Sequence, residues 1–132
     1  MKKIFSILFV LSVFCLAQAQ TFIGTMTVET YKREKVEVKL IAKNNTATLF
    51  LYDVKFSRFM PVKVDVAISN LKLNKQNNRT TISGNNIIPT VKGKGYNKYK
   101  ITNFSGNVNK ESLTFSTMMG NKRVSYNGKI KK

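Results

Sequence analysis

The clearest pattern along this chain is an alternation of apolar and polar residues that begins near Phe22 and recurs to the end of the sequence. Residues 36–43, 62–68 and 113–118 show it most clearly. A period of two places one set of side chains in a core and the other toward water, which is typical of antiparallel sheet. No window shows the apolar stripe with a 3.6-residue period that an amphipathic helix requires. The pattern therefore predicts an all-β protein.

Short pairs of Asn and Gly separate several of the alternating runs, at Asn44-Asn45, Asn77-Asn78 and Gly120-Asn121. These residues tolerate the positive φ that tight hairpins require. The longest irregular stretch is 85–97, which contains Pro89 and two glycines. We expect strands at residues 22–30, 34–43, 46–53, 61–69, 70–76, 79–84, 98–105, 112–118 and 121–127.

Eight or nine strands joined by tight reversals must protect the edges of their sheet. Closure into a barrel does so directly, and a two-sheet sandwich is the competing arrangement. Because sandwiches usually need longer crossing connections, the order of strands favours a single small antiparallel up-and-down (meander) β-barrel of about eight or nine strands. Such a barrel encloses either a packed interior or one small ligand, and both possibilities stay open at this point.

The first 19 residues have the features of a secretory signal peptide. Lys2 and Lys3 precede an apolar run over residues 4–16, and Ala17-Gln18-Ala19 fits a small-x-small cleavage signal. The run is short for a bilayer span, which needs about 20 residues. We expect cleavage near Ala19-Gln20, a barrel domain over 20–132 with no transmembrane segment, and a secreted or periplasmic location.

The residue types outside this leader exclude most catalytic chemistry. The chain has no histidine, and its single cysteine, Cys15, lies in the leader behind the bulky Phe14, so we expect no lipid attachment there. Zinc hydrolysis, serine–histidine triads and cysteine proteolysis are therefore excluded. Asp53 and Asp65 flank one connection and could face each other as a catalytic pair, but surface ion pairs with neighbouring lysines explain them more simply. We expect no enzyme activity, no cofactor and no metal.

Four blocks of sequence carry a family resemblance. They are NTATLFLYDVKFS at 45–57, MPVKVDV at 60–66, ISGNNIIP at 82–89 and YKITNFSG at 99–106. In this order and spacing the chain resembles the calycin-like (lipocalin-like) domain family of Bacteroidota-type bacteria. The resemblance implies a small secreted or periplasmic β-barrel. That family has no assigned activity, so the resemblance assigns no functional residue, and a shared architecture does not establish a shared ligand.

The apolar positions of the predicted strands either fill a solid core or line a pocket for a small apolar molecule, with a tyrosine hydroxyl as a polar anchor. In the strand at 46–53 two registers are possible, one that turns Phe50 and Tyr52 inward and one that turns Leu49 and Leu51 inward. The candidate interior and mouth residues are Met26, Val28, Phe50, Tyr52, Val64, Val66, Ile82, Ile87, Ile88, Ile101, Phe115 and Tyr126.

Charge gives the last constraint. The whole chain carries a net charge of +17, a field that attracts polyanions over long range. Ile87 and Ile88 would cap a barrel mouth, beside a basic rim formed by Lys92, Lys94, Lys98 and Lys100.

We expect a non-catalytic, exported, monomeric barrel that binds a small apolar or anionic amphipathic, lipid-like ligand. The alternative is a solid-core module whose basic surface binds envelope polyanions (lipopolysaccharide, acidic glycan or nucleic acid) or a protein partner, although the chain carries no specific nucleic-acid motif.

Overall fold

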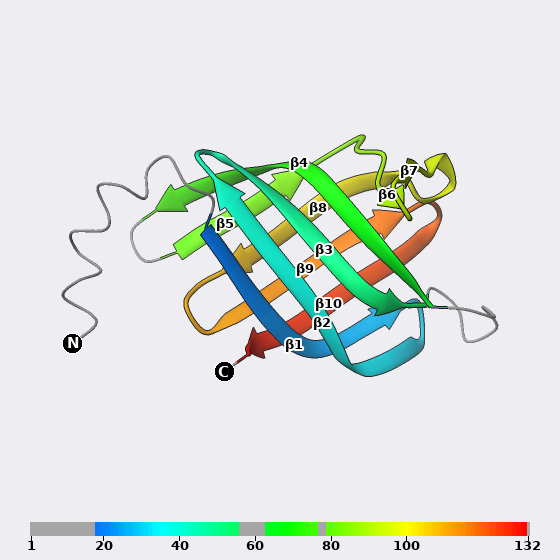
Figure 1. The fold of residues 1–132 in the computed structure, drawn as a ribbon, viewed down its shortest axis with the longest axis horizontal. Helices are drawn as coiled ribbons and strands as arrows, with labels where there is room; N and C mark the ends of the chain where they lie inside the picture. The colour runs from blue at the N-terminus through cyan, green and yellow to red at the C-terminus, as the bar shows by residue number, and fades with distance from the viewer. Residues whose placement is uncertain (1–17, 56–62, 77–78, 132) are drawn as a thin grey trace.

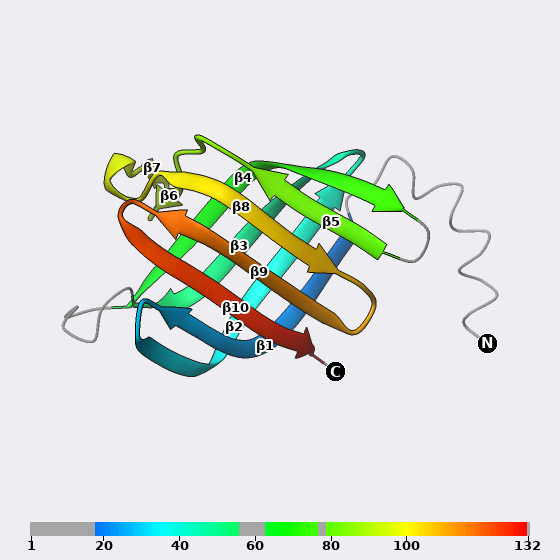
Figure 2. The ribbon, with the colours of Figure 1, turned by 180° about the vertical axis from the view of Figure 1, so that it is seen from behind.

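The computed structural model describes residues 18–55, 63–76 and 79–131. Eight strands form a closed antiparallel up-and-down β-barrel (Figures 1 and 2), which confirms the predicted fold class. The barrel strands are β1 (Gln18–Val28), β2 (Tyr31–Lys43), β3 (Thr46–Val54), β4 (Val64–Gln76), β5 (Arg79–Gly84), β8 (Ile101–Val108), β9 (Ser112–Met119) and β10 (Lys122–Ile130).

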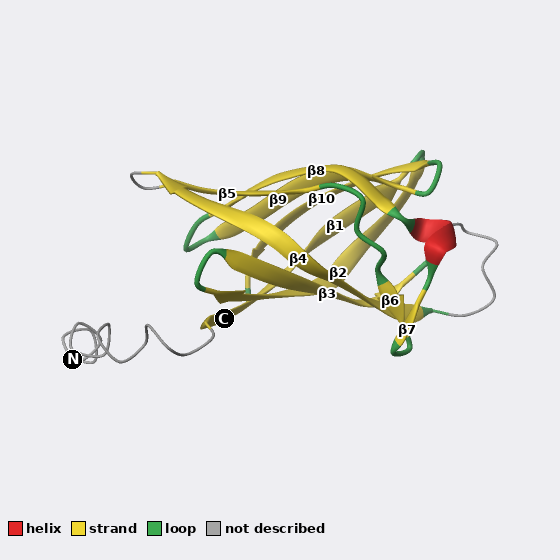
Figure 3. Ribbon diagram, turned by 90° about the horizontal axis from the view of Figure 1, so that it is seen from above, coloured by secondary structure: helices red, strands yellow, loops and turns green. Residues whose placement is uncertain are grey.

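The barrel closes where its last strand meets its first. β10 pairs with β1 from Phe22↔Ile130 to Val28↔Val124, while β3 pairs with β4 on the far side of the ring. Seen from above, β2 and β3 form one wall and β8 and β9 the opposite wall (Figure 3). The continuous ladder between the walls excludes the two-sheet sandwich.

A short hairpin and a single helical turn lie outside the ring. β6 (Thr90–Val91) pairs with β4 at Val66↔Val91, and β7 (Lys94–Gly95) pairs with β6. The 3₁₀ helix η1 (Asn97–Tyr99) then leads into β8. The stretch predicted to be irregular therefore contains two small strands, and the strand predicted at 98–105 begins only at Ile101. Within the described residues, no helix is long and apolar enough to cross a membrane.

From Val64 on, the predicted strands 61–69 and 70–76 are one strand, β4, so the barrel has eight of the predicted eight or nine strands. Asn70 adopts a φ of 60°, and the pairing with β3 shifts between Leu71 and Ile68. This extra residue is a β-bulge, which bends a strand without ending it. The bulge also restores the inward register, so that Ile68 and Leu71 are both fully buried.

The predicted turns are partly within the described residues. Asn44 and Gly120 both adopt positive φ, of 58° and 64°, in the turns that follow β2 and β9. Asn77-Asn78 lies outside the described residues, as does the predicted leader apart from Gln18 and Ala19. These two residues begin β1 and pair with Ala42 and Ile41 of β2.

The barrel interior is filled by side chains from all eight strands. They form one hydrophobic cluster, and each large side chain in it contributes roughly 1.5–3 kcal/mol by leaving water. The rings of Phe104, Phe115 and Tyr126 stack in sequence, with centroids 4.9 and 5.4 Å apart. The largest fully buried side chains are Phe22, Met26, Leu49, Leu51, Ile68, Leu71, Ile82, Ile101, Leu113, Met119 and Val28.

Candidate ligand site at the open end of the barrel

The two ends of the barrel differ. Residues 85–100, which we call the cap, form the connection at the end where β5 stops and β8 starts. At the other end lies a hollow of about 730 Å³, which we call the mouth. Its lining residues are Gln20, Leu40, Ala42, Leu73, Lys75, Thr80, Val108, Asn109, Lys110 and Glu111.

The mouth combines an apolar floor with a basic rim. Leu40, Leu73 and Val108 are buried members of the core cluster that also line the hollow. Lys75 and Lys110 follow Leu73 and Val108 by two residues, and both lysines are exposed. In a strand, residues two apart face the same side. Lys75 therefore continues the inward-facing series of β4 beyond Leu73, at the end of the strand that is exposed to water. A volume of this size lies within the range of small-molecule sites, about 300–1,000 Å³.

The rim is held in place by the turn between β8 and β9. The Oδ1 atom of Asn109 accepts hydrogen bonds from the backbone N–H groups of Glu111 and Ser112, at 2.8 and 2.9 Å. Gln20 reaches across from β1, where its Nε2 donates to the carbonyl of Asn109 at 3.4 Å. These contacts fix the turn that carries Lys110 and Glu111, so the basic rim does not depend on a free loop.

The predicted interior residues mostly fill the core instead of lining the mouth. Met26, Val28, Val66, Ile82, Ile101, Phe115 and Tyr126 are buried, and Val64 is partly buried against the same cluster. None of these eight residues lines the mouth. Among the described residues the middle of the barrel is therefore packed, and the mouth lies at one end of this packed core.

The interior placement of Phe50 and Tyr52 is wrong. Both side chains are partly exposed on the outer wall, where their rings stack with centroids 6.4 Å apart, and Leu49 and Leu51 are fully buried instead. The residues 49–52 are all apolar or aromatic, so either register satisfies the local pattern. A slip of one residue exchanges the two faces, and the neighbouring strands decide between them.

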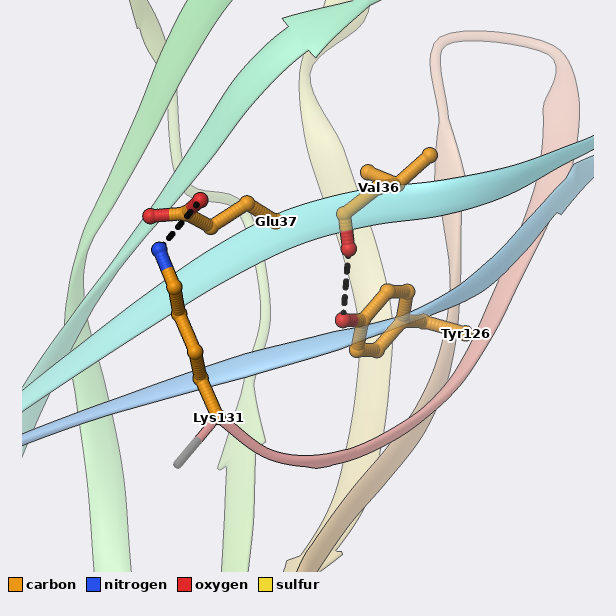
Figure 4. Close-up of polar contacts among 4 residues, drawn as sticks. All are labelled: Val36, Glu37, Tyr126 and Lys131. Carbon is orange, nitrogen blue, oxygen red and sulfur yellow. Dashed lines mark hydrogen bonds and ion pairs between the residues drawn. The ribbon is translucent and has the colours of Figure 1, made fainter.

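The hydroxyl of Tyr126 makes a hydrogen bond within the barrel. It donates a hydrogen bond of 2.9 Å to the carbonyl of Val36 (Figure 4), and burial, with a smaller effect of the Glu37 charge, raises the pKa of Tyr126. Glu37 itself pairs with Lys131 at 3.4 Å, and both side chains are exposed, so that pair adds little stability. Tyr126 thus ties β10 to β2 and is not an anchor at the mouth.

The two isoleucines that were expected to close a mouth, Ile87 and Ile88, have different environments in the cap. Ile87 exchanges two backbone hydrogen bonds with Ile101, at 3.0 and 2.7 Å, and packs against the core. Ile88 is 48% exposed. The predicted basic rim, Lys92, Lys94, Lys98 and Lys100, is exposed on the cap and therefore lies at the end of the barrel opposite the mouth.

A second hollow, of about 550 Å³, lies on the outer wall and contains the two aspartates considered as a catalytic pair. Asp65 and Asp53 are indeed close, but the Oδ1 atom of Asp65 accepts the backbone N–H of Asp53 at 2.9 Å. Arg33 donates to the carbonyl of Asp53, and Lys63 lines the same hollow. In the described part of the chain, no group of three His, Cys, Asp or Glu side chains could hold a metal ion.

Sequence reasoning missed the mouth because its floor comes from β2, β4 and β8, whose buried leucines and valine look like ordinary core positions. The available signal was a lysine on the inward register at a strand end.

No protein-family model matches the chain, and no curated protein or solved structure is detectably similar to it. The resemblance to calycin-like domains therefore stays a prediction.

Proposed function

We propose that this protein is a non-catalytic, exported, lipocalin-like barrel that binds a small anionic amphipathic molecule at the mouth. One observation carries the proposal: the apolar side chains of Leu40, Leu73 and Val108 line the same hollow as the exposed Lys75 and Lys110, which outnumber the one acidic lining residue, Glu111. An alkyl tail fits the floor, and a carboxylate or phosphate head fits the rim. The leader-like residues 1–19 support export.

The packed interior limits the affinity. A short tail that covers roughly 200 Å² of apolar surface gains about 5 kcal/mol, at about 25 cal/mol per Å². Part of this gain is lost to the ordering of ligand and side chains on association. A tail alone therefore binds no more tightly than the submillimolar range, and the two lysines supply both added affinity and the preference for an anion.

Isothermal titration with octanoate and 1-octanol tests this assignment, because the two probes share an alkyl chain and differ in head-group charge. We expect the protein to bind octanoate more tightly than octanol. The double variant Lys75→Gln/Lys110→Gln should weaken the binding of octanoate about tenfold and leave the binding of octanol unchanged. The matched control Lys32→Gln/Lys35→Gln removes two exposed charges from the start of β2, at the end of that strand away from the lining residues Leu40 and Ala42, and should leave both affinities near wild type.

A variant of the floor completes the experiment. Leu73 is 9% exposed, and Leu73→Gln places a polar group where the tail would lie, so it should weaken both probes. If no probe binds saturably, or if the mouth variants bind as the wild type does, the proposed site is wrong.

A second candidate function, the binding of envelope polyanions through the basic surface, is favoured by one observation. No acidic residue occurs between Asp65 and Glu111, a stretch that carries eight basic residues. This function predicts binding to heparin that is lost at high salt, because exposed charges are screened over about 8 Å at physiological ionic strength. Retention of a small molecule through a high-salt wash would instead favour the mouth.

A further inference from the structure

The cap carries an exposed apolar patch at the end of the barrel opposite the mouth. Among the described residues, Ile88 and Tyr96 are the exposed large hydrophobic side chains, at 48% and 39%. They are neighbours in space: a Cβ atom built on Gly95 would lie 3.5 Å from the Cγ2 atom of Ile88, and the N–H of Tyr96 donates to the carbonyl of Pro89 at 2.9 Å. Figure 1 shows β6 and β7 at the end of the barrel away from the C-terminus and the start of β1.

The charged side chains of the cap itself are all positive. Every charged residue of the cap is an exposed lysine, and the sequence has no acidic residue from 66 to 110. Lys92 and Gly93, at φ 56° and 82°, form the tight turn between β6 and β7. The lysines are Lys92, Lys94, Lys98 and Lys100.

The cap holds these side chains in a defined arrangement. Ile87 is bonded to Ile101 through both of its backbone polar groups, and the N–H of Gly120 donates to the carbonyl of Lys100 at 2.9 Å. The ring of Tyr96 packs against that of Tyr99, with centroids 4.9 Å apart. Because the backbone is anchored at both ends of the cap, the exposure of Ile88 is a property of the fold, and little ordering is needed on binding.

We propose that the cap docks the protein onto an anionic lipid surface, with Ile88 and Tyr96 entering the interfacial layer and the four cap lysines contacting lipid phosphates. Tyrosine suits the boundary between acyl chains and head groups. An exposed isoleucine gains from acyl chains, whereas a soluble glycan or nucleic acid offers it little apolar surface. The apolar patch therefore favours a bilayer over the polyanions that the charge alone would attract. This surface is separate from the mouth and does not depend on it.

Vesicle sedimentation tests the docking. We would measure partitioning to vesicles of equal phosphatidylglycerol and phosphatidylcholine, and to vesicles of phosphatidylcholine alone. We expect binding only to the anionic vesicles. Each lysine near such a surface contributes about a fivefold gain in partitioning, so the quadruple cap variant should lose at least about a hundredfold. The cap variant is Lys92→Gln, Lys94→Gln, Lys98→Gln and Lys100→Gln.

The matched control removes the same number of charges from exposed positions outside the cap. We expect it to lose less than about tenfold, because it changes only the long-range attraction. An equal loss in the two quadruple variants would overturn the proposal, as would the absence of binding to anionic vesicles. The control variant is Lys43→Gln, Lys72→Gln, Arg79→Gln and Lys129→Gln.

The apolar patch separates docking on lipid from attraction to any polyanion. Ile88→Ser/Tyr96→Ser keeps every charge, and because both side chains are exposed we expect the melting temperature to change little. Partitioning to anionic vesicles should fall about tenfold, while retention on heparin should stay the same. Wild-type partitioning in this variant would mean that charge alone acts, and the lipid proposal would fail.

A fluorescent reporter gives an independent measurement. The chain contains no tryptophan, so Ile88→Trp introduces a single emitter at the patch. Its emission should shift to shorter wavelength on anionic vesicles, because the ring leaves water. Ser105→Trp, at an exposed position of β8, should show no shift. A shift at position 105 and none at 88 would place the lipid contact on the barrel wall instead.

Discussion

Closure of the barrel depends on a point where two backbones approach too closely for a side chain. Gly24 of β1 pairs with Gly128 of β10, and the β1–β2 register shifts directly after Gly24. A Cβ atom at position 24 would lie 2.1 Å from the carbonyl oxygen of Asn127 and 2.3 Å from the Cα of Gly128, whereas ordinary contact begins at about 3.4 Å. Both atoms belong to the backbone, so Gly24→Ala has to push β1 and β10 apart.

The expected cost follows from what the separation breaks. Forced overpacking costs about 1–3 kcal/mol, and each ladder hydrogen bond lost near the pair costs about 1 kcal/mol. We therefore expect Gly24→Ala to lower the free energy of unfolding by about 3 kcal/mol, a large part of the 5–15 kcal/mol typical of a domain. The melting temperature should fall by roughly 12–24 °C, at about 4–8 °C per kcal/mol for small domains.

Urea denaturation followed by circular dichroism measures this loss, with Gly95→Ala as the matched control. Alanine reduces the freedom of the unfolded chain in both variants, so that effect cancels in the comparison. At Gly95 the nearest atom to a new Cβ is a side-chain methyl group at 3.5 Å, and we expect a change within about 0.5 kcal/mol. Equal stability of the two variants would refute the close approach of β1 and β10 and, with it, this geometry of closure.

Three further variants test the contacts that hold the walls and turns together. Tyr126→Phe removes the hydrogen bond to Val36 and should cost about 1 kcal/mol at pH 7 in urea denaturation. Because burial raises the pKa of Tyr126, the unfolded chain releases this proton first as the pH rises above about 10. The excess stability of the wild type over Tyr126→Phe is therefore complete below pH 10 and should shrink above it; parallel profiles would contradict this reasoning. Glu29→Ala removes the carboxylate that accepts the backbone N–H of Arg123 at 2.6 Å and should cost about 1–2 kcal/mol by thermal melting, as for other charged acceptors, while Glu29→Gln should recover part of it. Asn109→Ala frees the turn that carries Lys110, so it should cost about 1 kcal/mol and also weaken octanoate in titration; full octanoate affinity would show that the turn does not position the rim.

The barrel fold was predictable from the sequence because the patterns that indicate it are local. Alternation of period two fixes one buried face in each strand, and short turns leave neighbouring strands little choice but to pair with each other. Asn44 and Gly120 mark their turns by residue type, since both are tolerant of positive φ. Asn70 shows the same preference inside a strand, where it produces a bulge. A single residue that tolerates positive φ therefore does not tell a turn from a bulge.

The candidate site was much less predictable, because it is set by how strand ends meet. Leu40, Leu73 and Val108 are far apart in sequence and meet only once the ring has closed. The cap lysines were assigned to the same opening as the interior, but the order of strands carries residues 85–100 to the opposite end. Which end a loop occupies depends on the parity of the strands before it.

The packed core between the two ends makes the two proposed surfaces separable by experiment. Mutations at distant sites with no shared partners add within about 0.3–0.5 kcal/mol, and the mouth and the cap share no lining residue. Combining Lys75→Gln/Lys110→Gln with Ile88→Ser/Tyr96→Ser should therefore give the octanoate affinity of the first pair and the vesicle partitioning of the second. If the cap pair alone also weakened octanoate, the amphiphile would bind at the cap and the mouth proposal would fall. If the mouth pair alone reduced vesicle partitioning, the lipid contact would extend over the open end and the docking geometry would have to be reversed.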